Sequence, residues 1–166
     1  MQANGWELFA HPLLLDQLER LTLAVEKARA KKPGAYRGNA NFKVLAALHE
    51  LMFNQIPADP AKSTYRQGTT LGANRKHWFR AKFGGQRFRL FFRFDSSAKI
   101  IIYAWVNDSE TLRTYGSRDD AYAVFRRMLD RGEPPEGWAE LAREAGAAPA
   151  RNRLARAKAN TDRDDS

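Results

Sequence analysis

The sequence predicts an α+β fold: a small, mostly antiparallel sheet in the order β-α-α-β-β-β-α, with helices packed on one face. Two stretches with apolar residues at helical spacing follow a short N-terminal strand, and three strand-like stretches follow these helices. With 166 residues, the chain is long enough for one domain with its own core. We expect that domain to span residues 1–144. Residues 145–166 should form a disordered basic tail, because Leu154 is its one large apolar residue.

Helix and strand boundaries follow from prolines, glycines and apolar spacing. Pro12 suits the first turn of the first helix, Lys32-Pro33-Gly34 should end that helix, and Pro57 should end the second. The expected elements, in chain order, are a strand at 6–10, a helix at 12–32, a helix at 39–55, strands at 77–83, 86–94 and 99–106, a helix at 119–131 and a short helix at 137–144.

The net charge of +9 comes from one short segment. Residues 60–94 contain nine Lys and Arg and no Asp or Glu. Subtracting these nine from the 28 Lys and Arg of the chain leaves 19, which equals the number of Asp and Glu. A general solubilising charge would be spread over the surface, so the clustering predicts a polyanionic partner.

Within this segment, HWFRAKFGGQRFRLFFRF (77–94) reads as a hairpin of alternating aromatic and cationic residues. A two-residue Gly84-Gly85 turn would place Lys82 opposite Arg87 and Arg80 opposite Arg89. Because side chains alternate across a sheet, one face should be apolar core. The other should carry the cations, with Trp78 and Phe91 beside them.

Two explanations of this cationic face are open. It could be a solvated face whose charges discourage edge-to-edge aggregation. However, like charges opposite each other are unfavourable, and aromatic rings beside them suit stacking on bases. We therefore expect RNA binding, by the residues Arg75, Lys76, Trp78, Arg87, Phe91 and Arg93.

Four segments resemble one known protein family: NGWELFAHP, KFGGQRFRLFFRF, WVNDSETLRTYGSRDDAYAVF and RGEPPEGW. Together they are similar to the YhaV-type toxins of bacterial toxin–antitoxin pairs, in the RelE superfamily of mRNA-cleaving ribonucleases. The resemblance implies a RelE-like fold and an endoribonuclease that cleaves mRNA at the ribosome, inhibiting translation and growth. It also implies a cognate antitoxin of the AbrB-like, swapped-hairpin kind, in a complex that binds operator DNA and represses its own operon.

The resemblance also implies catalytic residues. Arg80, Lys82 and Arg89 match the superfamily's spacing of two cations on one strand and an arginine on the next. Arg113 and Tyr115, or alternatively Tyr122, would supply a further arginine and tyrosine. Lys82 is the expected proton acceptor, because arginine does not readily give up its proton.

Other kinds of site receive little support. The three histidines sit at a strand end or on expected core faces, and no metal-ligand spacing occurs, so we expect no metal and no cofactor. The absence of cysteine and of a long apolar run predicts a cytoplasmic protein without membrane contact. Two alternatives to a ribonuclease are a non-catalytic RNA- or DNA-binding module and an interaction protein that docks an acidic partner.

Overall fold

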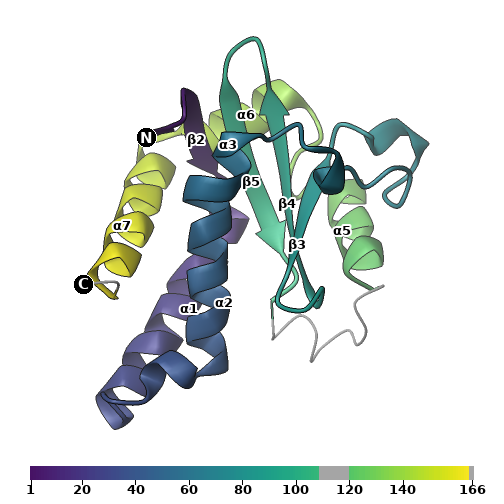
Figure 1. The fold of residues 1–166 in the computed structure, drawn as a ribbon. Helices are drawn as coiled ribbons and strands as arrows, with labels where there is room; N and C mark the ends of the chain where they lie inside the picture. Colours follow the sequence, from purple (N-terminus) through teal and green to yellow (C-terminus); the bar gives the residue numbers. More distant parts are fainter. Residues whose placement is uncertain (109–119, 165–166) are drawn as a thin grey trace.

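A five-stranded mixed sheet lies at the centre of the protein (Figure 1). The structure is a computed structural model that describes residues 1–108 and 120–164. The strands are β1 (Gln2–Ala3), β2 (Trp6–Ala10), β3 (Phe79–Phe83), β4 (Phe88–Asp95) and β5 (Ile100–Val106), in the spatial order β1-β2-β5-β4-β3. Neighbouring strands are antiparallel except β2 and β5, which run parallel. The predicted α+β class and mostly antiparallel sheet are confirmed.

One face of the sheet is covered by α1 (Pro12–Lys31), α2 (Ala40–Glu50) and α7 (Ala148–Asp164). The Nδ1 atom of His11 caps α1 by accepting from the backbone amide of Leu13 at 3.2 Å. The helix α2 continues through a π-helical turn (Leu51–Gln55) into the short α3 (Ile56–Ala58). Side chains of these helices and of β2 to β5 form one large buried cluster.

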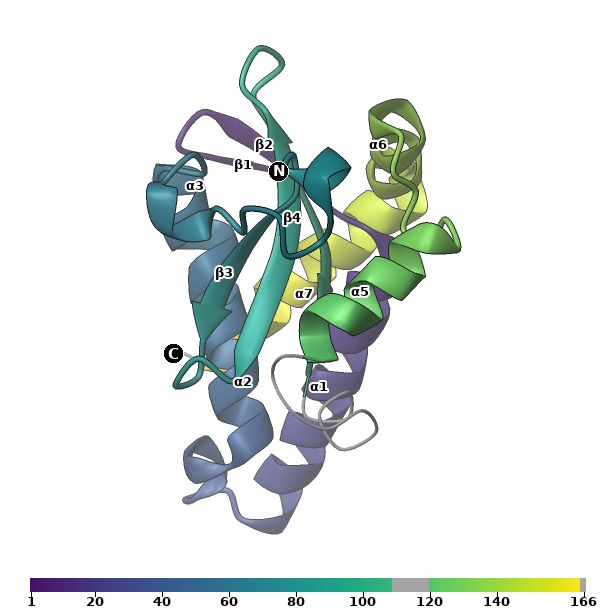
Figure 2. The same cartoon turned by 90° about the vertical axis from the view of Figure 1, so that its right-hand side faces the viewer.

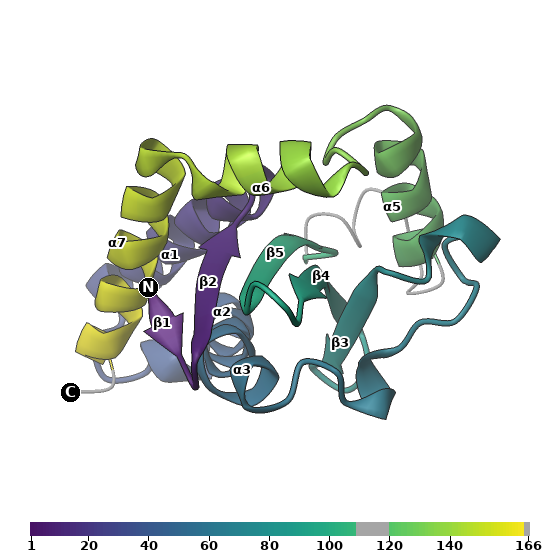
Figure 3. The same cartoon turned by 90° about the horizontal axis from the view of Figure 1, so that it is seen from above.

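The opposite face is covered by α5 (Asp120–Asp130) and α6 (Trp138–Gly146), which Figure 3 shows on the other side of the sheet from α2. The prediction that helices pack on one face is therefore wrong. A second buried cluster forms there around Trp78, Phe91, Trp105 and Phe125. The rings of Phe91 and Phe125 stack with centroids 4.3 Å apart. Phe125 lies on the apolar side that the sequence predicts for α5. This side is buried against the second face of the sheet.

The turn of the β3–β4 hairpin is longer than predicted. The paired residues nearest the turn are Phe83 and Phe88, and Lys82 lies opposite Arg89 rather than Arg87. Four residues form the turn, and Gly84, Gly85 and Gln86 all have positive φ angles, of 62°, 66° and 66°. The two strands are thus offset by two residues from the predicted register. An even offset preserves the alternation of side chains, so the predicted division into two faces holds for the paired strand residues. Arg87 lies in the turn and on the side of α2, not on the predicted cationic face.

The helix α7 replaces the disordered tail that the sequence predicts over most of 145–166. Leu154 is 1% exposed and Ala150 is also buried, both within the large cluster. Arg153 donates to Asp16 at 2.6 Å and to Glu19 at 2.7 Å, both on α1. The prediction fails because small alanines let the helix approach closely and ion pairs to a distant helix hold it, and neither effect is visible in local composition.

Candidate active site

The guanidinium groups of Arg80 on β3 and Arg89 on β4 converge on one hydroxyl group. The oxygen of Tyr122, on α5, accepts from Nε of Arg80 at 2.9 Å and from Nε of Arg89 at 3.0 Å. The Arg89 guanidinium carbon also lies 5.2 Å from the centre of the Tyr122 ring. Figure 2 shows α5 beside β4. The ring of Tyr122, on this helix, packs edge-on against Phe91 of β4 with centroids 5.8 Å apart. Tyr122, the alternative tyrosine of the sequence prediction, lies in this cluster.

Arg89 is held from several directions and is 5% exposed. Its Nη1 atom donates to the carbonyl oxygen of Gln86 at 3.1 Å. Its backbone amide donates to the side-chain oxygen of Asn107 at 2.6 Å. Asn107 also donates to the carbonyl oxygen of Arg87 at 3.1 Å and is itself fully buried. The position of Arg89 is thus set before any substrate arrives.

Lys82 lies directly across the ladder from Arg89 and points to solvent. Its ammonium group makes no hydrogen bond or ion pair with residues 1–108 or 120–164. A lysine opposite an arginine is an unfavourable pair of like charges. The three predicted residues therefore lie together on one face, with Lys82 as their exposed member.

The loop between α3 and β3 closes one side of this face, because arginines hold it by its carbonyl groups. Arg80 donates to the carbonyl oxygen of Thr64 at 2.7 Å, and Arg126, one turn after Tyr122 on α5, donates to that of Thr70 at 2.6 Å. Lys62 and Arg66 lie exposed on the same loop. Sequence reasoning missed Arg126 and Asn107. The sequence does offer a signal for Arg126. It follows Tyr122 by four residues, a spacing that places both side chains on the same face of a helix.

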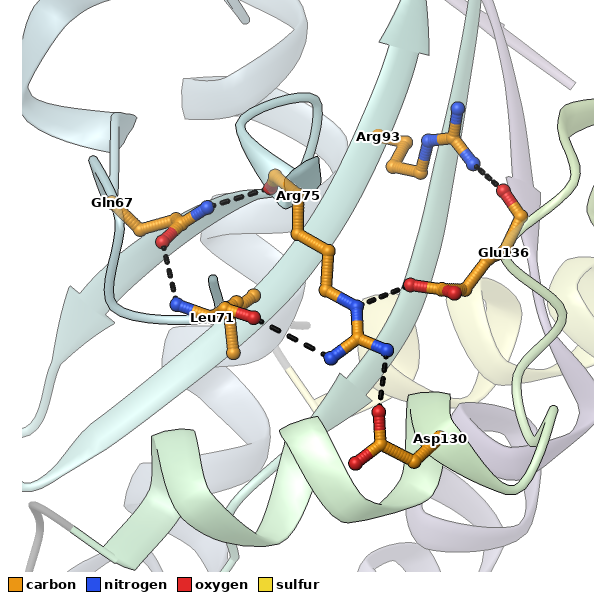
Figure 4. A network of polar contacts seen from close by, with 6 residues as sticks. All are labelled: Gln67, Leu71, Arg75, Arg93, Asp130 and Glu136. Carbon is orange, nitrogen blue, oxygen red and sulfur yellow. Dashed lines mark hydrogen bonds and ion pairs between the residues drawn. The ribbon is translucent and has the colours of Figure 1, made fainter. Parts of the chain in front are cut away.

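Arg75 and Arg93, which the sequence predicts as RNA-binding residues, are engaged with Asp130 and Glu136 (Figure 4). Arg75 pairs with Glu136 and donates to Asp130 at 2.6 Å, and the hydrogen bond to Glu136 is the main cause that raises its pKa. Arg93 donates to the backbone carbonyl of Glu136 at 2.6 Å, and burial lowers its pKa. These two arginines instead hold the loop before β3 and the α5–α6 connection against the sheet.

Trp78 and Phe91, which the sequence places beside the cations as stacking platforms, are fully buried. Both rings pack against Phe125 of α5, with centroids 5.1 and 4.3 Å from its own. The prediction that they are open to bases is therefore wrong, because it leaves out the helix over this face. Arg93 lies between two indoles, with its guanidinium carbon 5.4 Å from the ring centre of Trp78 and 5.3 Å from that of Trp138.

The remaining predicted residues are distributed as follows. Lys76 and Arg87 are exposed, with Arg87 over the Phe88 ring at 5.5 Å, and both stay candidates for RNA binding. Arg113 and Tyr115 lie outside the described residues.

Within residues 1–108 and 120–164, no three His, Asp or Glu side chains gather closely enough to hold a metal ion. In the same part of the chain, no helix is long and apolar enough to cross a membrane.

The cluster of Arg80, Arg89, Lys82 and Tyr122 has a definite chemical capacity. Two fixed guanidinium groups offer several N–H donors in planar forks, which match the oxygens of a phosphate. Beside them stand an amine that can exchange a proton and a phenol that can donate one. Such an arrangement suits a phosphodiester whose negative charge increases during reaction.

Comparison with known proteins agrees with this capacity. The profile of the YhaV toxin family, described as a toxin with endonuclease activity of a toxin–antitoxin system, matches residues 8–146. The ribonuclease toxin YhaV of Escherichia coli K12 is 44% identical over 144 residues, which cover 86% of this chain and 94% of that protein. The toxin YhaV of Escherichia coli O157:H7 is equally similar, at 44% over 144 residues with the same coverage.

No solved structure shows a significant match to this chain. The family profile and these relatives nevertheless cover most of it, including the β3–β4 hairpin and α5, which build the candidate site. The resemblance predicted from four sequence segments is confirmed, and the protein belongs to the YhaV family of toxins with endonuclease activity from toxin–antitoxin systems.

Proposed function

We propose that this protein is a metal-independent endoribonuclease that cleaves mRNA by attack of a ribose 2′-hydroxyl on the adjacent phosphate. The observation that carries the proposal is the convergence of Arg80 and Arg89 on the hydroxyl of Tyr122, with Lys82 opposite Arg89. A phosphate seated against the two guanidinium groups would have Lys82 and Tyr122 within reach of its ester oxygens.

Each residue has a distinct role in this reaction. Lys82, in its neutral form, accepts the proton of the 2′-hydroxyl as the 2′-oxygen bonds to phosphorus. Arg80 and Arg89 stabilise the charge that builds on the non-bridging oxygens, where preorganised donors contribute most to rate. Tyr122 fixes both guanidinium groups, and its hydroxyl lies between them.

The step balances without a metal or an added reactant. One bond forms, between the 2′-oxygen and phosphorus, and one breaks, between phosphorus and the 5′-oxygen of the next nucleotide. The 5′-oxygen takes a proton from Tyr122 or from water and leaves as a hydroxyl. The products are a 2′,3′-cyclic phosphate, which water can open to a 3′-phosphate, and a 5′-hydroxyl end.

Cleavage of a defined RNA oligonucleotide in EDTA tests this chemistry. The unsubstituted protein, called the parent below, should cleave this oligonucleotide. An oligonucleotide with a 2′-deoxynucleotide at the scissile position should remain uncleaved. Replacing Arg80, Lys82 or Arg89 by alanine should lower the rate by about 100-fold or more. Lys27→Ala, at an exposed position on α1, serves as the control. Normal cleavage by all three variants would refute the assignment.

RNA binding measured on the same variants separates catalysis from simple recognition. Lys82→Ala should retain most of its RNA affinity, because exposed cations such as Lys62, Arg66 and Arg87 remain. Strong RNA binding by the parent with no cleavage under any condition would favour the alternative, a non-catalytic RNA- or DNA-binding module.

The cellular role that we propose is inhibition of translation and growth through cleavage of mRNA in the cytoplasm, at the ribosome. A cognate antitoxin of the AbrB-like kind neutralises the protein, and the complex binds operator DNA and represses its own operon. Membership of a toxin–antitoxin family supports this role. Mapping new RNA 5′ ends after induction, with and without the antitoxin, tests it: no new ends and no growth arrest would overturn it.

A further inference from the structure

A groove separates α2 from the tip of the β3–β4 hairpin, on the opposite side of the sheet from Tyr122. Figures 1 and 2 both show the hairpin tip beside the N-terminal half of α2. The groove has a volume of about 280 Å³. Its lining residues are Ala40, Lys43, Val44 and Ala47 from α2 and Phe83, Gly84, Arg87 and Phe88 from the hairpin.

The chemistry of the groove is apolar inside and cationic at the rim. Val44 and Phe88 are buried, and Ala47 and Phe83 are half-buried. The rings of Phe83 and Phe88 stack on each other, with centroids 5.3 Å apart. Both charged residues of the lining, Lys43 and Arg87, are cations and are exposed. An occupant should therefore combine an apolar group with negative charge on its flanks.

The tight packing of the hairpin tip depends on Gly84. A Cβ atom at this position would lie 2.6 Å from a ring carbon of Phe88, and its φ of +62° disfavours other residues. The glycine thus lets the chain close over the Phe88 ring, and it forms one wall of the groove. Gly84 therefore contributes both to the close packing of the hairpin tip and to the lining of the groove.

The groove leads to the candidate active site along both strands of the hairpin. Phe83 directly follows Lys82 on β3, and Arg87 precedes Arg89 by two residues. A chain segment anchored in the groove could therefore pass around the hairpin tip and cover the exposed Lys82. A segment that follows this path would link occupation of the groove to the access of RNA to Lys82.

We propose that the groove is a docking site for the cognate antitoxin, through an acidic amphipathic segment that inserts a branched apolar side chain. This inference rests on the proposed function, in which an antitoxin neutralises the protein. The apolar side chain would fill the space between Val44 and Phe83, and carboxylates on either side would pair with Lys43 and Arg87. Complementary charge and an apolar anchor together are typical of helix-in-groove recognition.

A nucleotide of the RNA fits the groove less well. The lining offers no side-chain hydrogen-bond acceptor, and its donors are the two cations at the rim. A base buried there would lose hydrogen bonds to water without replacing those of its amino groups, which is costly. The stacked pair of Phe83 and Phe88 also already buries ring surface that a base would need. A branched apolar side chain loses no hydrogen bonds in the same place.

Two groove variants test the proposal. Ala47→Glu places a carboxylate in the apolar part, and Lys43→Glu reverses one rim charge, while Lys27→Glu makes the same exchange on exposed α1. RNA cleavage by the purified variants should stay within about twofold of the parent. Affinity for the purified antitoxin should fall by about tenfold or more in both groove variants and not in Lys27→Glu. In cells, co-expressed antitoxin should no longer restore growth.

The outcomes separate the possibilities. Antitoxin affinity within twofold of the parent in both groove variants would overturn the proposal. Loss of RNA affinity and cleavage with normal antitoxin binding would overturn it as well, and would assign the groove to RNA. If the parent itself fails to cleave RNA, the proposed function fails, but the antitoxin-binding comparison still decides the docking site.

A crosslinking experiment identifies the occupant directly. The chain has no cysteine, so Ala47→Cys creates a single thiol in the groove, which can carry a photoreactive maleimide. In the complex with antitoxin it should crosslink to an antitoxin peptide with an apolar residue between acidic ones. Leu23→Cys, at an exposed position of α1, should give little crosslink. Equal crosslinking from both positions, or crosslinking to RNA in place of antitoxin, would contradict the assignment.

Discussion

The side-chain oxygen of Asn107 accepts a hydrogen bond from the backbone amide of Arg89 at 2.6 Å, where β5 ends. The neighbouring Val106 is braced from α1, because Gln17 donates to its carbonyl at 2.6 Å and accepts from its amide at 3.1 Å. Gln17 and Asn107 are both buried. A chain of polar contacts thus runs from α1 through the end of β5 to Arg89 on β4.

Replacing Asn107 by alanine should impair the site through the backbone. The change removes two hydrogen bonds and leaves the Arg89 amide and the Arg87 carbonyl without them. Loss of buried hydrogen bonds costs about 1–3 kcal/mol each, so the free energy of unfolding should fall by about 2–6 kcal/mol. Because Arg89 then loses its fixed position, kcat for RNA cleavage should fall more than KM changes.

Asn74→Ala is the matched control for this prediction, since Asn74 is exposed and outside the candidate site. Urea unfolding and cleavage kinetics should show the parent's values for this variant. A purely structural role for Asn107 would lower stability but leave kcat of the folded fraction unchanged. That result would contradict the positioning of Arg89 by Asn107.

Tyr122→Phe removes the hydroxyl oxygen that accepts from both Arg80 and Arg89. The ring should stay in place, because it packs edge-on against Phe91 with centroids 5.8 Å apart. We expect stability to change by about 1 kcal/mol and the cleavage rate to fall about 10- to 100-fold. Tyr36→Phe is the control, since the Tyr36 hydroxyl interacts with Arg37 far from the site. Equal rates for both variants would exclude a role of the Tyr122 hydroxyl.

The secondary structure and the two faces of the hairpin could be predicted because they depend on local pattern. Apolar spacing placed β2 at the predicted residues and α1 within one residue of its predicted end. The strand residues of the hairpin lie on the predicted faces although the turn is longer than predicted. The reason is that the observed register differs from the predicted one by an even number of residues. The run IIIYAWV of β5, apolar on both faces, was the one local signal that helices would cover both sides.

The assembly of the site could not be predicted in the same way. Tyr122 reaches Arg89 only because α5 folds back over the sheet, and 33 residues separate the two along the chain. Glu136 and Asp130 neutralise Arg75 from outside the basic segment, so counting charges within that segment overestimated its free cations. Burial of Trp78 and Phe91 likewise depends on Phe125, a residue of a distant helix.

The helix α7 gives a prediction about stability alone. Leu154→Ala should lower the free energy of unfolding by about 2–4 kcal/mol, because the side chain is 1% exposed within the large cluster. Cleavage should be unaffected, since α7 lies on the opposite face of the sheet from Tyr122. Leu23→Ala, at a side chain 58% exposed, should change stability by less than about 0.5 kcal/mol. Equal stability of the two variants would mean that α7 does not dock, as the sequence alone predicts.

His77 should make stability depend on pH between neutral and mildly acidic solution. His77 is exposed, and partial desolvation of its ring is the first cause that lowers its pKa below 6.5, with the charge of Arg93 as the second. Arg75 adds to the effect, and Glu136 opposes it. Because the folded state binds the proton less readily than the unfolded state, the contribution of His77 is fully present above pH 6.5. It is lost as the pH falls through the lower, folded-state pKa.

Urea midpoints measured from pH 7.5 to 5 check this expectation. The parent should lose more stability over this range than His77→Gln, whose side chain does not titrate. Lys76→Gln removes an exposed neighbouring charge that does not titrate in this range either, and it should keep the parent's slope. Since Arg93 contributes through its charge, high salt should reduce part of the difference. Parallel curves for the parent and His77→Gln would show that the imidazole titrates alike in the folded and unfolded states.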